Sequence, residues 1–157
     1  MERRARMGFR RGVPAAVVVL IAGCELFVLA PPPVVCYGVR TEVGTVEGYH
    51  SVAGVYVDVA NATEKAITRI EIGFYLFDGD GLPAPAIGGH YFTAVHDQPL
   101  AAGERREICL SVDEAFYYAP LPPLGVRRLA FSRILFEDGS SWEDPYGRYL
   151  WDSDDAE

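Results

Sequence analysis

The eleven residues from Ile67 to Phe77, ITRIEIGFYLF, decide the fold class of this 157-residue chain. From Ile70 onward, large apolar side chains occupy every second position, and the positions between them start with Glu71 and Gly73. A period of two is the spacing of a β-strand that buries one of its faces. The stretch therefore predicts a long strand whose core-facing side chains are Ile70, Ile72, Phe74 and Leu76.

The same alternation recurs on both sides of this strand. Val55 to Val59 places three valines on one face, Glu107 to Val112 places three apolar side chains together, and His90 to Val95 is a weaker example. In Leu129 to Phe136 the apolar residues change face part of the way along, and a bulge near Arg133 or burial of both faces would explain this. All four segments are predicted to be strands.

Turn sequences separate these strands, and helical periodicity is scarce. Asp78-Gly79-Asp80-Gly81 is a strong turn signal, and only Val112 to Tyr118 has the spacing of a single helical turn. Short strands joined by turns favour an antiparallel sandwich. We therefore expect an all-β protein, with a single antiparallel immunoglobulin-like β-sandwich over residues 38–151 that follows an N-terminal signal or anchor helix.

Part of this region resembles a known family. Val57-Asp58-Val59-Ala60-Asn61, then Phe74-Tyr75-Leu76-Phe77-Asp78 and Gly81, resemble the FxLYD-like immunoglobulin-type domains of bacterial surface lipoproteins. In that family one strand ends in Asn, and the next ends in a Phe-x-Leu-Tyr-Asp-like stretch. The Leu100-Ala101-Ala102-Gly103-Glu104 connection is similar to one found there. The resemblance covers about residues 52–112 and implies an envelope setting without catalytic residues.

The N-terminus has the pattern of a targeting segment. Residues 1–12 are rich in arginine, and Val13 to Gly23 forms an apolar run. This run falls within the ~7–15 residues expected for the core of a secretion signal. It is shorter than the ~20 residues that a membrane span requires. We therefore expect residues 1–23 to be a signal peptide that directs the body across the membrane.

Ile21-Ala22-Gly23-Cys24 resembles the lipobox of bacterial lipoproteins. In that family the leader is cut just before the cysteine, whose sulfur receives diacylglycerol. The resemblance implies lipidation of Cys24, followed by a Pro-rich tether over residues 24–37. An uncleaved anchor is the alternative, because Val13 to Ala30 holds one charge and Pro31-Pro32-Pro33 would end such a helix. Either form places the body in the cell envelope, tied to a bacterial membrane and facing the periplasm or the surface.

Charge is distributed unevenly along the chain. Residues 24–157 contain 9 Arg or Lys against 21 Asp or Glu. Such a body repels nucleic-acid phosphates and anionic lipid headgroups, so we expect no nucleic-acid partner. The acidic segment 152–157 is expected to be a disordered tail.

Two cysteines besides Cys24 lie in the body, Cys36 and Cys109. An even number of cysteines in an oxidising compartment allows one disulfide, which would close a long loop. Two free thiols are the alternative, because spacing alone does not determine pairing.

No catalytic motif is present. The sequence has no Gly-x-Ser-x-Gly, no His-Glu-x-x-His and no phosphate-binding glycine loop. We therefore predict no catalytic residue, no cofactor and no metal site. Two weaker hypotheses stay open. His90 and His96 could help to bind a metal or a small ligand, and Glu143 with Asp144 could serve a small hydrolase.

A cluster of aromatic residues predicts a surface that binds a protein partner. Phe116, Tyr117 and Tyr118 precede several prolines in a loop, and Trp142 lies in a later turn. Aromatic side chains of this kind are enriched at protein interfaces, although they could equally cover an open end of the sandwich. We therefore expect a non-catalytic, membrane-tethered module that binds an envelope protein or has a structural role.

Overall fold

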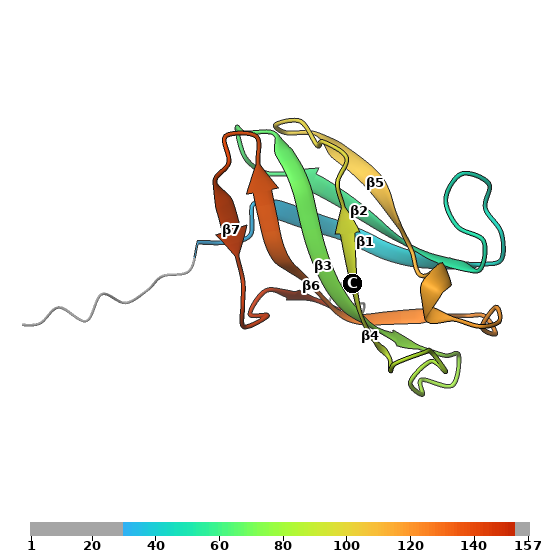
Figure 1. Ribbon diagram of the computed structural model, residues 1–157. Helices are drawn as coiled ribbons and strands as arrows, with labels where there is room; N and C mark the ends of the chain where they lie inside the picture. Colours follow the sequence, from blue (N-terminus) through green and yellow to red (C-terminus); the bar gives the residue numbers. More distant parts are fainter. Residues whose placement is uncertain (1–29, 153–157) are drawn as a thin grey trace, which may run out of the picture.

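The computed structural model describes residues 30–152, which form two antiparallel β-sheets packed face to face (Figure 1). This confirms the all-β sandwich predicted from the sequence. The predicted signal peptide, the lipidation site at Cys24 and the segment 153–157 lie outside the described residues. Within residues 30–152 no helix is long and apolar enough to cross a membrane.

The smaller sheet has three strands and the larger sheet has five. In the smaller sheet the order is β1-β2-β5, with bounds β1 (Val34–Val43), β2 (Ala53–Asn61) and β5 (Arg105–Ser111). In the larger sheet the order is β4-β3-β6-β7, and β8 also pairs with β6. Its bounds are β3 (Ile67–Phe77), β4 (Tyr91–His96), β6 (Gly125–Phe136), β7 (Ser141–Glu143) and β8 (Leu150–Trp151).

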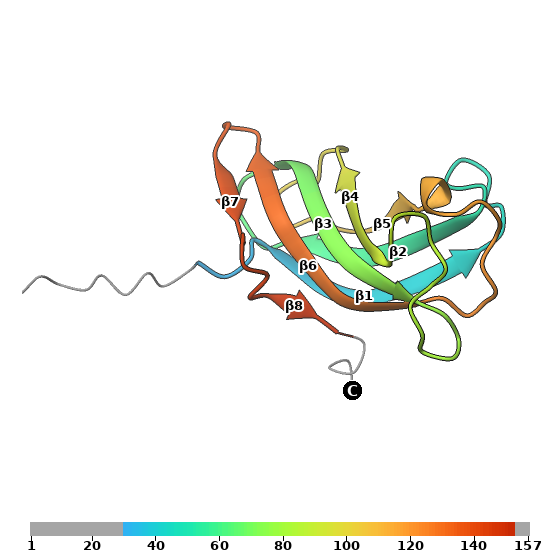
Figure 2. The same ribbon diagram turned by 60° about the horizontal axis from the view of Figure 1, so that its bottom comes forward.

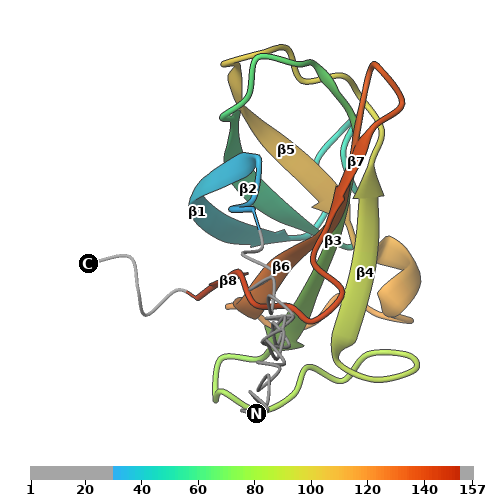
Figure 3. The same ribbon diagram turned by 90° about the vertical axis from the view of Figure 1, so that its left-hand side faces the viewer.

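This strand order is that of an immunoglobulin-like sandwich whose fourth strand has joined the second sheet. Seen from the end where the chain enters the sandwich, β1, β2 and β5 lie on one side and β3, β4 and β7 on the other (Figure 3). The predicted helical turn is a 3-10 turn, η1 (Asp113–Ala115).

The alternation of β3 is confirmed side chain by side chain. Ile70, Ile72, Phe74 and Leu76 are completely buried. They face a second layer of buried side chains that includes the three valines of β2 and the apolar residues of β5, namely Val55, Val57, Val59, Ile108 and Leu110.

The change of face in β6 has the cause that the sequence suggests. Glu71 pairs with Arg133 and Ile72 pairs with Phe131, so Ser132 has no opposite residue and forms a bulge. The extra residue shifts the parity of the strand. As a result Phe131 and Ile134 both point into the core.

The first strand was not expected. β1 begins at Val34, inside the segment 24–37 that the sequence analysis assigned to the tether, so the sandwich starts before residue 38. Val34 pairs with Asn61 at the end of β2 and is 1% exposed. Residues 34–37 of the predicted tether therefore belong to the sandwich.

The loops fall into two groups at opposite ends of the sandwich (Figures 1 and 2). At the proximal end, where the chain enters β1, lie the loops 62–66, 97–104 and 137–140. At the distal end lie the loops 44–52, 78–90 and 112–124. The distal loops are the longer ones.

Candidate interaction surface

Large apolar side chains are exposed on all three distal loops. The most exposed are Tyr117, Tyr118 and Leu121, at 83%, 87% and 85%. By contrast, residues 62–66, 97–104 and 137–140 at the proximal end expose no large apolar side chain, and outside the distal loops Tyr146, on the loop between β7 and β8, is the most exposed one among residues 30–152. We call the apolar set the distal surface, and its members are Tyr49, Leu82, Ile87, Tyr117, Tyr118 and Leu121.

Buried residues on either side force the loop between them outward. Phe116 is 7% exposed, and its ring centroid lies 6.4 Å from that of Phe92 on β4. Leu124, at the other end of the loop, is 5% exposed. The segment between these two anchors passes over the end of the core, which leaves Tyr117 and Tyr118 in solvent.

Hydrogen bonds join the three distal loops to one another. The Asp113 carboxylate accepts hydrogen bonds from the backbone N–H groups of Ser51 and Val52, both at 2.7 Å. The Ile87 N–H donates to the carbonyl of Ala115 at 2.8 Å. The loop 112–124 is thus bonded to both of the others, and these bonds hold the three loops that carry the distal surface together.

These bonds also set the charge state of Asp113. Partial burial would raise the pKa of its carboxyl group, but the hydrogen bonds from Ser51, Val52 and Ala53 outweigh that effect and lower it. Asp113 is therefore a carboxylate at neutral pH, which is the form that accepts these bonds.

The distal loops carry acidic residues and no basic ones. Residues 44–52, 78–90 and 112–124 contain no Lys or Arg. Asp78 and Asp113 accept hydrogen bonds from the backbone of the loops. The exposed carboxylates are Glu47, Asp80 and Glu114. The distal surface therefore combines apolar side chains with negative charge.

The aromatic residues that the sequence singled out do not form one surface. Tyr117 and Tyr118 lie on the distal surface, but Phe116 is part of the core. Trp142 lies on β7 near the proximal end, packs against the core and donates from Nε1 to the carbonyl of Ala30 at 3.0 Å. The inclusion of Phe116 and Trp142 with the two tyrosines was therefore wrong. Leu121, in the same loop, was missed, and so were Tyr49, Leu82 and Ile87, because nothing local in the sequence brings their loops to this end.

The possible disulfide is not formed, since Cys36 and Cys109 are both free thiols. They lie on β1 and β5, which pair with opposite edges of β2. Cys36 packs against the core, whereas Cys109 alternates with the buried residues Ile108 and Leu110 and so faces outward. Strands two apart are separated by about 10 Å, and a disulfide needs its Cα atoms within about 7 Å. The fold therefore keeps the two thiols apart.

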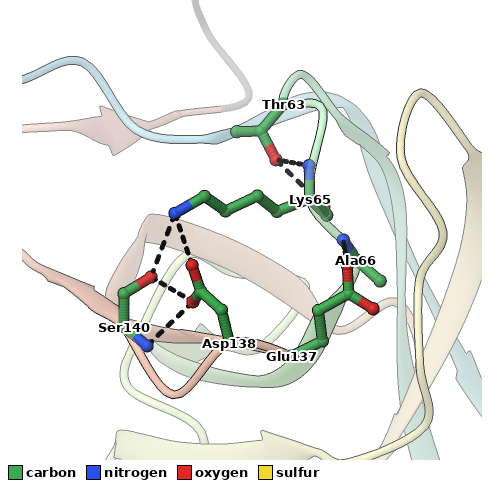
Figure 4. Close-up of polar contacts among 6 residues, drawn as sticks. All are labelled: Thr63, Lys65, Ala66, Glu137, Asp138 and Ser140. Atoms are coloured by element: carbon green, nitrogen blue, oxygen red, sulfur yellow. Dashed lines mark hydrogen bonds and ion pairs between the residues drawn. The ribbon is translucent and has the colours of Figure 1, made fainter.

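A polar cluster joins two proximal loops around Lys65, the chain's single lysine (Figure 4). Its Nζ lies 2.6 Å from Asp138 Oδ2 and 3.4 Å from Ser140 Oγ. The hydrogen bond from Lys65 has the largest effect on the pKa of Asp138, and those from Ser140 come next. Together they hold this pKa well below its usual range. Because the Lys65 ammonium is paired with a carboxylate, it is not placed to take a proton from Ser140. The cluster is suited to fastening loop 62–66 to loop 137–140.

A second polar network covers the outer face of the smaller sheet. Arg40 donates two hydrogen bonds to Glu107, both at 2.8 Å, and its guanidinium lies 3.8 Å from the centre of the Tyr56 ring. The Tyr56 hydroxyl is 3.1 Å from His50 Nε2, and His50 Nδ1 is 3.0 Å from the carbonyl of Gly44. A carbonyl only accepts, so Nδ1 is assigned as the donor to Gly44.

This network has the chemistry of a structural brace. Two effects raise the pKa of Tyr56 to about 12. Burial is the larger, and a hydrogen bond with Cys109 is the second. Burial likewise raises the pKa of the Cys109 thiol. Both groups are therefore protonated at neutral pH, which disfavours either as a nucleophile.

The residues of the two weaker hypotheses do not converge. His90 and His96 are six residues apart at the two ends of β4, which corresponds to about 20 Å. Glu143 is exposed and pairs with Arg133, whereas Asp144 is 2% exposed and accepts hydrogen bonds from the N–H groups of Arg148 and Tyr149. Residues 30–152 contain no group of three or more His, Cys, Asp or Glu side chains that could hold a metal ion.

Comparison with known proteins gives one structural similarity. No family model matches the chain, and no curated protein matches it. A solved structure of a hypothetical protein from Peptoclostridium difficile 630 is similar over 74% of this chain and 88% of its own length, with 12% sequence identity and a TM-score of 0.46. This similarity carries no information on function.

Proposed function

We propose that the protein is an envelope-anchored, non-catalytic module that binds a protein partner through its distal surface. The observation that carries the proposal is the joining of three loops into one surface that exposes six large apolar side chains. Large apolar side chains exposed together at one end of a domain are typical of interaction sites.

The chemistry of the distal surface suits a protein partner. Tyrosine combines a large apolar ring with a hydroxyl group and is enriched among the residues that dominate binding energy. Complete burial of one such apolar side chain contributes about 1.5–3 kcal/mol before the costs of association. Several of them in a preorganised surface are enough for specific binding.

The anchoring part of the proposal rests on the lipobox-like residues Ile21 to Cys24. The fold supports this part of the proposal through the end of the sandwich at which the chain enters. The chain enters the sandwich at the proximal end, and Trp142 holds the carbonyl of Ala30 there. A lipid on Cys24 would therefore leave the distal surface facing away from the membrane.

The proposal is tested by site-specific photocrosslinking in a bacterial host that expresses the full chain. A photoreactive amino acid replaces Tyr118, Tyr49 or Leu82 in turn, and Glu64, exposed on a proximal loop, is the matched control position. We expect the same protein adduct from all three distal positions and none from Glu64. The substitution Leu121→Ser should reduce the adduct formed from Tyr49.

Two results would contradict the proposal. One is an equally strong adduct from Glu64, and the other is the absence of an adduct from every distal position. Turnover of an envelope substrate by the purified protein would refute its non-catalytic part.

A further inference from the structure

β4 is an edge strand with free backbone groups. It pairs only with β3, and the bond from the Leu76 N–H to the carbonyl of His90 fixes which residues face that partner. In an antiparallel ladder the bonded pairs alternate. The N–H and C=O groups of Tyr91, Thr93 and Val95 therefore point away from β3, and among residues 30–152 no strand pairs with them.

The other edges of the sandwich are protected against strand addition and β4 is not. β5 carries Arg105, Arg106 and Glu107, β1 has a register shift between Cys36 and Gly38, and β7 has three residues. Charges, bulges and short length are the usual devices that prevent pairing at an edge. The sequence of β4, YFTAVH, contains no Lys, Arg, Asp, Glu or Pro, and its pairing with β3 has no register shift.

A groove runs beside this edge. It has a volume of about 470 Å³ and lies between β4 and the segment from Ser111 to Ala115. Its lining combines apolar side chains, including the buried Phe74 and Val112 and the half-buried Phe92, with polar residues, and polar atoms make up more of its exposed surface than apolar ones. An extended segment that paired with β4 would place alternate side chains in this groove, because successive side chains of a strand point to opposite faces.

The charge of the groove indicates the kind of segment that fits. Glu114 lines it, and none of its lining residues is Lys or Arg. A basic side chain on the added strand would meet this carboxylate. The β4 strand of a second copy does not supply one, because it has no Lys or Arg.

We propose that β4 accepts an extended segment of the partner as an added antiparallel or parallel strand, and that the side chains of this segment that face the groove include both apolar and basic ones. The inference rests on the proposed function and names the way in which the partner binds. Backbone hydrogen bonds to Tyr91, Thr93 and Val95 supply affinity, and the groove with Glu114 supplies selectivity.

The experiment measures fluorescence anisotropy of a labelled peptide with the full chain in lipid nanodiscs. The probe is the labelled seven-residue peptide Thr-Val-Thr-Arg-Thr-Val-Thr, whose valines and arginine lie on one face of a strand. Two further peptides carry N-methyl groups, either on the two valines and the arginine or on the threonines. In an added strand, the N–H groups of every second residue point towards β4 and those of the residues between them point away. An N-methyl group removes the hydrogen-bond donor of its residue. We therefore expect one methylated peptide to lose binding and the other to keep it.

Protein variants locate the binding. Thr93→Pro removes an N–H that points away from β3, so the ladder with β3 keeps its bonds, and Thr93→Ala is the matched control that retains the N–H. We expect Thr93→Pro to weaken binding by about tenfold or more and Thr93→Ala by less than about twofold. Glu114→Gln should weaken binding of the arginine peptide and reduce its dependence on salt. The methylated peptides need no protein variant, so the test survives if Thr93→Pro does not fold.

Three outcomes would overturn the inference. They are the absence of saturable binding up to about 1 mM peptide, equal loss of binding by both methylated peptides, and unchanged binding to a folded Thr93→Pro variant. Dimerisation through β4, detected by sedimentation and abolished by Thr93→Pro, would replace the partner with a second copy. If the inference fails while Tyr118 still gives its adduct, the proposed function stands without it.

Discussion

Oδ1 of Asp113 lies 2.7 Å from the backbone nitrogen of Val52, and this contact joins two distal loops that are 61 residues apart in the sequence. The other carboxylate oxygen binds the N–H of Ser51 at the same distance. One side chain thus sets the relative position of loops that carry Tyr49 and Tyr118. A surface held in place before binding loses less entropy when its partner arrives.

Asp113→Ala should destabilise the sandwich. It removes the acceptor for the N–H groups of Ser51 and Val52, and hydrogen bonds to a charged group contribute about 1.5–3 kcal/mol. We expect the free energy of unfolding in urea to fall by about 2 kcal/mol. The adjacent, exposed Glu114 is the control, and Glu114→Ala should change it by less than about 0.5 kcal/mol. Equal losses in the two variants would contradict this role.

The contribution of Asp113 should depend on pH in a defined direction. Its folded pKa is lowered, so its stabilisation is present above the unfolded carboxyl pKa of about 4 and is lost as pH falls through the folded value. The difference in unfolding free energy between wild type and Asp113→Asn should therefore shrink below about pH 4. A difference that grew on acidification would show that the bonds do not favour the ionised form.

Gly54→Ala should be strongly destabilising and Gly38→Ala should not. A Cβ at Gly54 would lie 2.3 Å from His50 Cδ2, and the His50 ring is 5% exposed and held at both nitrogens. We expect a loss of about 2–3 kcal/mol in thermal or urea unfolding. A Cβ at Gly38, on the neighbouring strand, meets nothing within 4 Å. In the double variant Gly54→Ala with His50→Ala, the loss of unfolding free energy should be smaller than the sum of the losses in the two single variants.

Cys36 and Cys109 should both be free and slow to react. Burial raises the pKa of the Cys36 thiol to about 11 and also raises that of Cys109. Without reductant, the denatured protein should take up one alkyl group on each residue, while the native protein reacts slowly at about pH 8. Mass spectrometry of the digested protein reports the number of alkyl groups on each cysteine in the denatured and in the native state. A Cys36–Cys109 crosslinked peptide would contradict the register of the smaller sheet.

The raised pKa of Cys36 also predicts an effect at alkaline pH. The unfolded thiol ionises near its ordinary value of 9.0, whereas the folded thiol ionises near about 11. The stabilisation is therefore complete below pH 9 and is lost as pH rises towards 11. In Cys36→Val this part of the pH dependence should be missing, and unfolding titrations between these values would detect it.

The mass of the protein extracted from bacterial membranes tests the anchor. If the resemblance at Ile21 to Cys24 holds, the chain begins at Cys24 and carries a diacylglyceryl group. Cys24→Ser should abolish both the added mass and the cleavage. A full-length mass without lipid would instead establish the uncleaved anchor from Val13 to Ala30.

The strands with one buried face could be predicted from the sequence. In β3 the face towards the core is apolar at every position from Ile70 to Leu76, so the period of two is unmistakable. The bulge in β6 was predictable for the same reason, because a break in parity has few other causes. β1 was missed because it is an edge strand with mostly half-buried or exposed side chains, which blurs its alternation.

The candidate surface could be predicted only in part. Tyr117 and Tyr118 stand out as aromatic residues among prolines, but the burial of Phe116 depends on Phe92, which lies in a different strand. The contact of Asp113 with Val52 and the free edge of β4 both follow from strand order. Strand order is a property of the whole chain and has no local signature.

The direction of β1 has a consequence for electrostatics at the membrane. Its ten residues run from the proximal end towards the distal loops, which corresponds to about 33 Å at about 3.3 Å per residue. In physiological salt, the potential of charged headgroups decays over about 8 Å. On a lipid-anchored chain standing upright, Glu114 and Tyr118 would lie several decay lengths above the bilayer. The affinity of the partner for the distal surface should therefore be the same over anionic and neutral lipids. The salt dependence of this affinity should reflect the charges of the partner and not those of the membrane.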